Sequence, residues 1–259
     1  MSLDWPPISV ETNASDEDLQ RMIAGVEGTF QGLGEVDPYW AVLTDDRFRS
    51  EHIETTRDEF YATGANGIQT VLRSVERNGG IANAKATCFE LGCGVGRSTI
   101  YLAEKFDRVI AADVSLPHLA VTRQAAQLYG RTNIETRHVG KLSELDALPE
   151  FDFFFTVIVL QHNPPPVIAM LLRKLLSKLK PGGMAYFQVP TYIRGYEFDV
   201  ASYLARPVTD IEVHCLPQMQ LFKILEQTGC KLLEFREDTA AGGDISTVLS
   251  NTVIARRIN

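Results

Sequence analysis

The sequence lacks any long apolar run: no stretch of its 259 residues reaches the roughly 18 consecutive apolar residues that a membrane-spanning helix needs. Residues 1–30 likewise hold no apolar segment long enough for a secretion signal. Basic side chains are scarce, with 25 Lys and Arg against 33 Asp and Glu, and the net charge is −8. A chain of this charge is poorly suited to neutralise phosphates. These absences predict a soluble cytoplasmic protein that binds neither a membrane nor a nucleic acid.

Cysteine is also rare. The four cysteines, Cys88, Cys93, Cys215 and Cys230, form no Cys-x-x-Cys pair, and no histidine stands at the spacing of a zinc site. A chain of this length buries enough surface to fold without a disulfide or a metal. We therefore expect reduced thiols and no metal ion.

From residue 86 onward, β-type runs alternate with helical patterns. Helices of 10–15 residues between such strands predict an α/β fold with a doubly wound parallel sheet and right-handed crossovers. The predicted strands are 87–91, 109–112, 134–139, 153–158, 184–189, 232–235 and 248–256. The predicted helices are 98–106, 119–129, 167–179 and 218–228.

Two regions fall outside this alternation. Residues 1–80 read as helical, and residues 1–60 carry 14 acidic and 4 basic side chains, which is typical of a solvated helical face. We expect 1–80 to form a cap on a main domain of residues 81–259. Residues 190–216 follow the fifth strand and are rich in polar and aromatic side chains. Because ligands of open α/β sheets bind beyond the carboxyl ends of the strands, this segment is predicted to form a substrate-side insertion.

The most specific feature is a glycine loop that follows the first strand directly. Gly92, Gly94 and Gly96 have no Cβ, so a ligand can lie against the backbone, and they allow positive φ. Glu90 precedes the loop. Asp113 ends the next strand, 17 residues after Gly96, where a carboxylate can accept hydrogen bonds from both hydroxyls of a ribose. Asp113 can instead cap the following helix, a role that Ser115 could also fill.

Four separated segments resemble the motifs of class I S-adenosylmethionine-dependent methyltransferases. The glycine loop is similar to the family's first motif, and Asp113-Val114-Ser115 to its second. The segment 151–156 with Gln161 and His162 resembles the family's fourth strand, and 179–183 the turn before its fifth. The resemblance implies a Rossmann-like, mostly parallel seven-stranded sheet whose last strand is antiparallel.

The resemblance also implies a cofactor, S-adenosylmethionine, and the residues that hold it. The implied cofactor residues are Glu90, Gly92, Gly94, Gly96, Asp113, Val114 and Ser115, with Thr156 and Val157 near the methionine end. Many relatives have an acid after the third strand that binds the adenine amino group, whereas this chain has Lys141, whose ammonium can only donate. Backbone groups near Lys141 and Leu142 are left to hold the adenine.

Two histidines are candidates for removing a proton from the acceptor. His162 follows the fourth strand near the expected methyl position, and His214 lies in the 190–216 segment. A neutral imidazole is a suitable base near pH 7, although either ring can instead be structural. Aromatic faces near a sulfonium could come from Tyr39, Trp40, Phe60 and Tyr61, which could equally dock the cap onto the sheet. The expected acceptor is a small molecule methylated on oxygen or nitrogen, and the expected assembly is a monomer or a homodimer.

Other functions remain open at this point. Residues 163–166 read Asn-Pro-Pro-Pro and resemble the Asn-Pro-Pro-Tyr motif of base-methylating enzymes, but Pro166 offers no ring for stacking a flipped base. A dinucleotide site is disfavoured because Arg97 stands where its fingerprint has glycine. The remaining alternatives are an aminopropyltransferase-like enzyme and a non-catalytic module that binds an adenosine ligand.

Overall fold

The computed structural model describes residues 6–81, 83, 85–208, 210–242, 244 and 246–258. Its longer helices are α1 (Asp16–Val36), α2 (Ile53–Arg77), α4 (Leu116–Leu128), α6 (Pro165–Ser177) and α8 (Gln218–Gln227). The short helices are η1 (Asp46–Phe48), α3 (Thr99–Leu102), α5 (Leu142–Asp146), η2 (Leu160–His162) and α7 (Val200–Leu204). The strands are β1 (Ser9–Val10), β2 (Thr87–Leu91), β3 (Arg108–Asp113), β4 (Ile134–His138), β5 (Phe151–Thr156), β6 (Leu179–Ile193), β7 (Glu197–Phe198), β8 (Cys230–Asp238) and β9 (Val248–Arg257). No helix among these residues is long and apolar enough to cross a membrane.

Seven strands form one sheet in the order β4-β3-β2-β5-β6-β9-β8. The pairs from β4 through β6 are parallel, and β9 runs antiparallel to both β6 and β8. The prediction of a mostly parallel, doubly wound sheet with an antiparallel last strand is confirmed. β1 and β7 pair separately as a two-stranded parallel ribbon.

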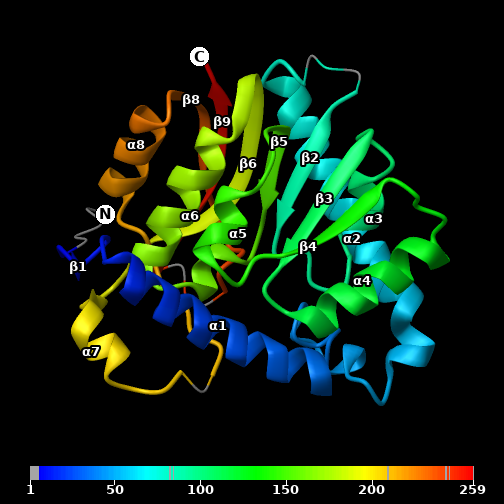
Figure 1. Cartoon of the computed structure of the whole chain (residues 1–259), viewed down its shortest axis with the longest axis horizontal. Helices are drawn as coiled ribbons and strands as arrows, with labels where there is room; N and C mark the ends of the chain where they lie inside the picture. The colour runs from blue at the N-terminus through cyan, green and yellow to red at the C-terminus, as the bar shows by residue number, and fades with distance from the viewer. Residues whose placement is uncertain are drawn as a thin grey trace.

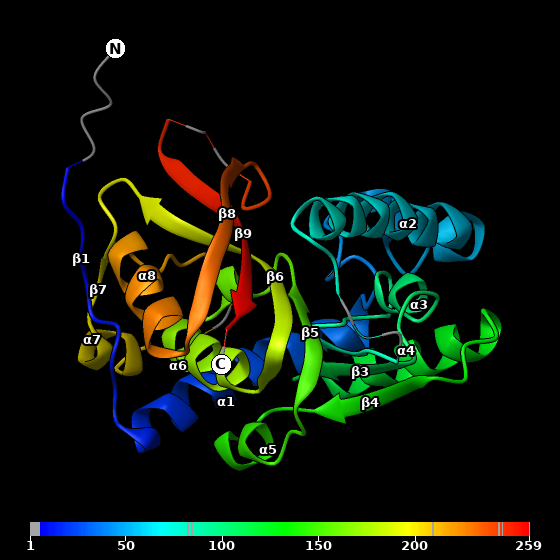
Figure 2. The same cartoon turned by 90° about the horizontal axis from the view of Figure 1, so that it is seen from above.

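Helices cover both faces of the sheet (Figure 2). One face packs against α6 and α8 in a cluster that includes Phe89, Phe154 and Phe187. The other face packs against α2 and α3 in a cluster that includes Phe153 and Phe155. Consecutive phenylalanines of β5 therefore point to opposite faces, as the two-residue period of a strand requires. This burial on both faces explains why β5 is almost continuously apolar.

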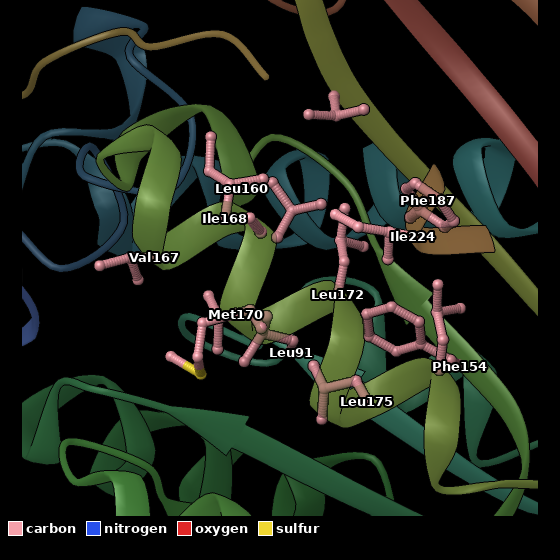
Figure 3. Close-up of a cluster of buried hydrophobic side chains, with 14 of the residues drawn as sticks. Leu91, Phe154, Leu160, Val167, Ile168, Met170, Leu172, Leu175, Phe187 and Ile224 are labelled. Atoms are coloured by element: carbon pink, nitrogen blue, oxygen red, sulfur yellow. The ribbon is translucent and has the colours of Figure 1, made fainter. Parts of the chain in front are cut away.

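Helix α6 is deeply buried against one face of the sheet, with ten of its thirteen residues buried. Figure 3 shows Leu172 and Leu175 of α6 near Phe154 of β5. Each such side chain contributes about 1.5–3 kcal/mol through burial. The helix begins at Pro165 rather than at the predicted residue 167, because proline is well tolerated in the first turn, where its missing N–H needs no partner.

Two other boundaries differ from the prediction. Helix α3 has only four residues, since the chain beyond Leu102 tightens into turns in which Lys105 N–H donates to Leu102 O. Strand β6 begins at Leu179 and continues through the predicted Pro-Gly-Gly turn. The pairing register with β5 shifts between Phe151 and Phe153, which accommodates Gly182 at a φ of 81°.

Helix α1 lies across the carboxyl ends of the parallel strands (Figure 1). Polar side chains attach it there. Gln20 Nε2 donates to Gly140 O beyond β4, and Gln31 Nε2 donates to Val114 O beyond β3. Glu27 accepts from His138 Nε2 at 2.8 Å, at the end of β4. The helix therefore covers the edge of the sheet where ligands of α/β proteins bind.

Candidate active site

A cavity of about 720 Å³ lies at the carboxyl ends of β2, β3 and β5. Its walls come from the glycine loop, from α1 and α2, and from the segments after β5 and α7. This volume falls in the range of sites for small ligands and cofactors. Part of the wall comes from α1 through Ile23, Val26 and Phe30, which stand on one side of the helix.

The glycine loop has the backbone geometry expected of a close-contact loop. Gly92, Gly94 and Gly96 have φ values of 73°, 54° and 83°, in the left-handed region that side chains disfavour. A Cβ on Gly94 would lie 2.4 Å from Val42 Cγ2, in the segment that follows α1. Gly94 therefore has no room for a side chain, and Val42 closes on the loop at the cavity wall.

Asp113 lies in the cavity wall with its carboxylate held in place by backbone groups. Gly94 N–H donates to Asp113 Oδ2 and Ser115 N–H donates to Asp113 Oδ1, both at 2.8 Å. A carboxylate has about four acceptor positions, so positions remain for ligand hydroxyls. The helix-capping role falls to Ser115, whose Oγ accepts from His118 N–H at the start of α4.

Glu90 and Arg97 both line the cavity and lie on either side of the glycines in the sequence. Burial raises the pKa of Glu90 to about 7, against the opposing effects of the Thr99 hydroxyl and the Arg97 charge. The Thr99 hydroxyl donates to Glu90 Oε2 at 2.6 Å. Burial also lowers the pKa of Arg97, whose Nε has no hydrogen-bond partner within the described residues. A carboxyl and a guanidinium buried in a cavity wall make both side chains candidates for ligand binding.

His162 has one ring nitrogen fixed and the other available. Nδ1 donates to the carbonyl oxygen of Glu212 at 2.9 Å, and Nε2 has no hydrogen-bond partner within the described residues. The ring packs against Phe30 with 5.8 Å between centroids. Burial lowers the pKa of His162, so the imidazole is neutral near pH 7 and can accept a proton at Nε2.

A strained turn follows β5 at the same wall. Ile158 has a φ of 59°, and it is the one non-glycine residue with positive φ among those described. Such a conformation is rare for a β-branched residue and costs about 1–3 kcal/mol. Ile158 N–H donates to Gln188 Oε1 at 2.9 Å, and Gln188 Nε2 donates to Gln161 Oε1 at 3.1 Å. Gln188 thus holds both the strained turn and the Gln161 amide beside the cavity.

The cavity wall includes only some of the residues expected from the sequence. Those in the wall are Glu90, Gly92, Gly94, Asp113, Val114, Val157 and His162, whereas Gly96, Ser115, Lys141, Leu142, Thr156 and His214 are not among its lining residues.

The backbone expected to hold adenine is bonded within the protein. Leu142 N–H donates to Gln20 Oε1, and Lys141 N–H donates to Glu144 Oε2. Both donors are thereby occupied. The wall in this region comes instead from the apolar Val139 and Leu145.

His214 lies behind the wall in a polar cluster. Its Nε2 donates to Glu212 Oε2, and its Nδ1 accepts from the Tyr196 hydroxyl at 2.6 Å. Burial lowers the pKa of His214 to about 4. With both nitrogens engaged inside the protein, the ring is placed to support the segment rather than to reach an acceptor.

The aromatic rings proposed for the cap also lie elsewhere. Phe60 and Tyr61 are buried in a cluster of the N-terminal region, and Arg49 covers the Trp40 ring at 4.4 Å. The aromatic residue that α1 contributes to the cavity is Phe30. The sequence shows that Phe30 shares an apolar stripe with Ile23 and Val26, but it does not show whether that stripe faces the cavity or another part of the protein. Arg97 and Gln161 also line the cavity, although neither was predicted as a site residue. Both lie inside segments that resemble family motifs, and no further feature of the sequence singles them out.

Residues 89–183 match the family model of a methyltransferase domain. That span holds the glycine loop, Asp113 and His162. The chain thus carries a methyltransferase domain and is similar to class I S-adenosylmethionine-dependent methyltransferases. The chain is 36% identical over 107 residues to a trans-aconitate 2-methyltransferase of Azoarcus sp. (strain BH72). That match covers 40% of this chain and 39% of the relative, which is less than half of either protein.

Solved structures share the fold of this chain at low sequence identity. The magnesium protoporphyrin IX methyltransferase of Synechocystis PCC 6803, solved with bound S-adenosylhomocysteine, has a TM-score of 0.60 and 18% identity, covering 91% of this chain and 99% of that one. The cyclase SpnF has a TM-score of 0.55 and 14% identity, covering 97% and 99%. A fold shared with a cyclase shows that the architecture alone does not determine the reaction.

Proposed function

We propose that this chain transfers a methyl group from S-adenosylmethionine to an oxygen or nitrogen of a small-molecule acceptor. The observation that carries the proposal is the joint placement, in one cavity wall, of the Asp113 carboxylate and the unbonded Nε2 of a neutral His162. The family match and the bound ligands of the structural relatives support the choice of cofactor.

The cofactor residues proposed are those of the glycine loop together with Glu90, Asp113 and Val114. When bound, S-adenosylmethionine supplies a methyl group whose carbon–sulfur bond breaks as the acceptor atom bonds to the carbon, with the electron pair remaining on sulfur. Asp113 accepts hydrogen bonds from the ribose hydroxyls, and Glu90 offers a buried acceptor to the cationic part of the ligand. The apolar side chains of α1 exclude water from the cavity.

His162 is proposed as the general base. Its Nε2 takes the proton that the acceptor's O–H or N–H gives up, while Glu212 O holds the ring in the required tautomer. Residues 1–80 are proposed as the cover of a cofactor domain formed by residues 81–259, and 190–216 as the acceptor-side wall. Of that last segment, Ile211 and Val213 line the cavity.

Two measurements test the proposal together. Thermal unfolding with S-adenosylhomocysteine, its decarboxylated relative or NAD is expected to give a rise in Tm with S-adenosylhomocysteine alone. In Asp113→Ala that rise should largely disappear, whereas the exposed control Asp107→Ala should keep it. Mass spectrometry of acceptor mixtures then detects products heavier by one methyl group. Stabilisation by NAD or by the decarboxylated ligand would favour another enzyme class, and binding without any product would favour a non-catalytic module.

A further inference from the structure

The cavity wall contributed by the segment after α7 is aliphatic. Ile211 and Val213 line the cavity, and Val213 is 40% exposed. The residue between them, Glu212, sends its carboxylate to Arg206 and to His214 Nε2. Arg206, Glu212 and His214 thus pair with one another, and the aliphatic side chains of Ile211 and Val213 are left to meet the ligand.

The cavity also holds few charges that could bind an anionic acceptor. Its acidic side chains are those of Asp113 and Glu90. Arg97 is the one Lys or Arg side chain among the described lining residues. Its Nη1 donates to the Thr63 hydroxyl of α2, and its charge interacts with Glu90, so it lies within the glycine-loop part of the wall. The neutral His162 adds no positive charge.

The neutral polar groups near His162 are better suited to a single hydroxyl or amine. Gln161 lines the cavity, its Oε1 accepts from Gln188, and its own amide nitrogen makes no hydrogen bond within the described residues. Asn163 also lines the cavity, although its Nδ2 donates to Val159 O. An acceptor with one O–H or N–H can meet Gln161 and His162 while the rest of it contacts aliphatic side chains.

We propose, resting on the proposed function, that the acceptor is an uncharged and largely apolar small molecule, not a polycarboxylate. A carboxylate placed against Ile211 and Val213 would lose its hydration without gaining a cation or a donor there. This separates the chain in substrate class from the trans-aconitate methyltransferase that it partly resembles, whose named substrate carries several carboxylates.

The test compares matched neutral and anionic ligands on the full chain saturated with S-adenosylhomocysteine. Ligand-observed NMR titrations use two pairs, methyl 4-hydroxybenzoate with 4-hydroxybenzoate, and the trimethyl ester of trans-aconitate with trans-aconitate. We expect the neutral member of a pair to bind about a hundredfold more tightly than the acid. Equal or tighter binding of the acids would overturn the inference, and so would the absence of binding by methyl 4-hydroxybenzoate, the neutral ligand that has one O–H.

Variants locate the binding at the aliphatic wall. Val213→Asp is expected to weaken the neutral ligand about tenfold or more, whereas the similarly shaped Val213→Thr should retain binding within about threefold. Ile211→Asp serves if Val213→Asp does not fold. Neutral ligands that bind all variants alike would also overturn the inference. Stabilisation by S-adenosylhomocysteine is read separately: its loss contradicts the proposed function, whereas its presence together with a preference for acids contradicts only the acceptor class.

Discussion

The Nδ1 nitrogen of His162 lies 2.9 Å from the carbonyl oxygen of Glu212, fifty residues away in the sequence. The contact joins the turn after β5 to the segment after α7. It makes Nδ1 the protonated nitrogen and leaves the lone pair of Nε2 available at the cavity. A backbone carbonyl here performs the orienting role that a carboxylate often has beside a catalytic histidine, without adding a negative charge that would raise the pKa of the ring.

Replacing His162 by Ala should lower kcat by about 10²- to 10⁴-fold, the usual contribution of a general base, while S-adenosylhomocysteine binding changes little. Burial lowers the pKa of His162, and a base works only when unprotonated. The decline of the wild-type rate at low pH should therefore be centred below pH 6.5. Steady-state rates between pH 5 and 8 check both expectations.

The control for this variant is His52→Ala, at the exposed start of α2, which should leave the rate and its pH profile unchanged. Methyl transfer by His162→Ala at the wild-type rate would mean that the acceptor loses its proton to solvent or carries none. A decline centred at or above pH 6.5 would place the base elsewhere.

The sheet and the cofactor loop could be predicted because their signals are local in the sequence. A strand that runs into closely spaced glycines, followed by a second strand that ends in Asp113, requires few long-range contacts to interpret. The alternation of strands and helices likewise restricts the sheet to a small set of topologies. The direction of β9, by contrast, came from the family resemblance and not from the residues of the strand itself.

The acceptor side could not be predicted because it depends on contacts between distant segments. Whether the side of α1 that holds Phe30 meets the cavity or solvent depends on how that helix crosses the sheet. Gln188 and Gln161 form a hydrogen bond although they are 27 residues apart, and no sequence feature near either residue predicts this contact. The tyrosines and His214 drew attention to residues 190–216, yet the chain turns these polar groups away and presents Ile211 and Val213.

Glu90 should make the stability of the protein depend on pH. Burial raises its pKa from 4.5 to about 7, so between these values the folded state holds a proton that the unfolded state releases. The contribution of this group is fully present below pH 4.5 and is lost as the pH rises through 7. Its size is about 3 kcal/mol over that interval. Because buried histidines such as His162 and His214 titrate with the opposite sign, the difference between the wild type and Glu90→Gln carries the effect: in urea unfolding between pH 4.5 and 8, the wild type should lose this amount of stability relative to Glu90→Gln.

Glu226→Gln, on the exposed side of α8, is the matched control and should keep the wild-type pH dependence. Parallel stability curves for the wild type and Glu90→Gln would show that the carboxyl is ionised in the folded protein throughout the interval. In that case the Arg97 charge outweighs the effect of burial.

The contact between Val42 and the glycine loop can be measured with a double-mutant cycle. In Gly94→Ala the new methyl group would lie 2.4 Å from Val42 Cγ2, at a φ of 54° that alanine disfavours by about 1–2 kcal/mol. Because Gly94 N–H also positions Asp113, this variant should lose both stability and affinity for S-adenosylhomocysteine. Val42→Ala removes the clash but not the backbone strain, so the double variant should recover only part of the lost stability, about 1 kcal/mol.

Gly28→Ala is the control, since a Cβ there meets nothing within 4 Å and alanine favours the helix. Strictly additive effects of the Gly94 and Val42 substitutions, in both unfolding and ligand titrations, would show that Val42 does not close on the loop in solution.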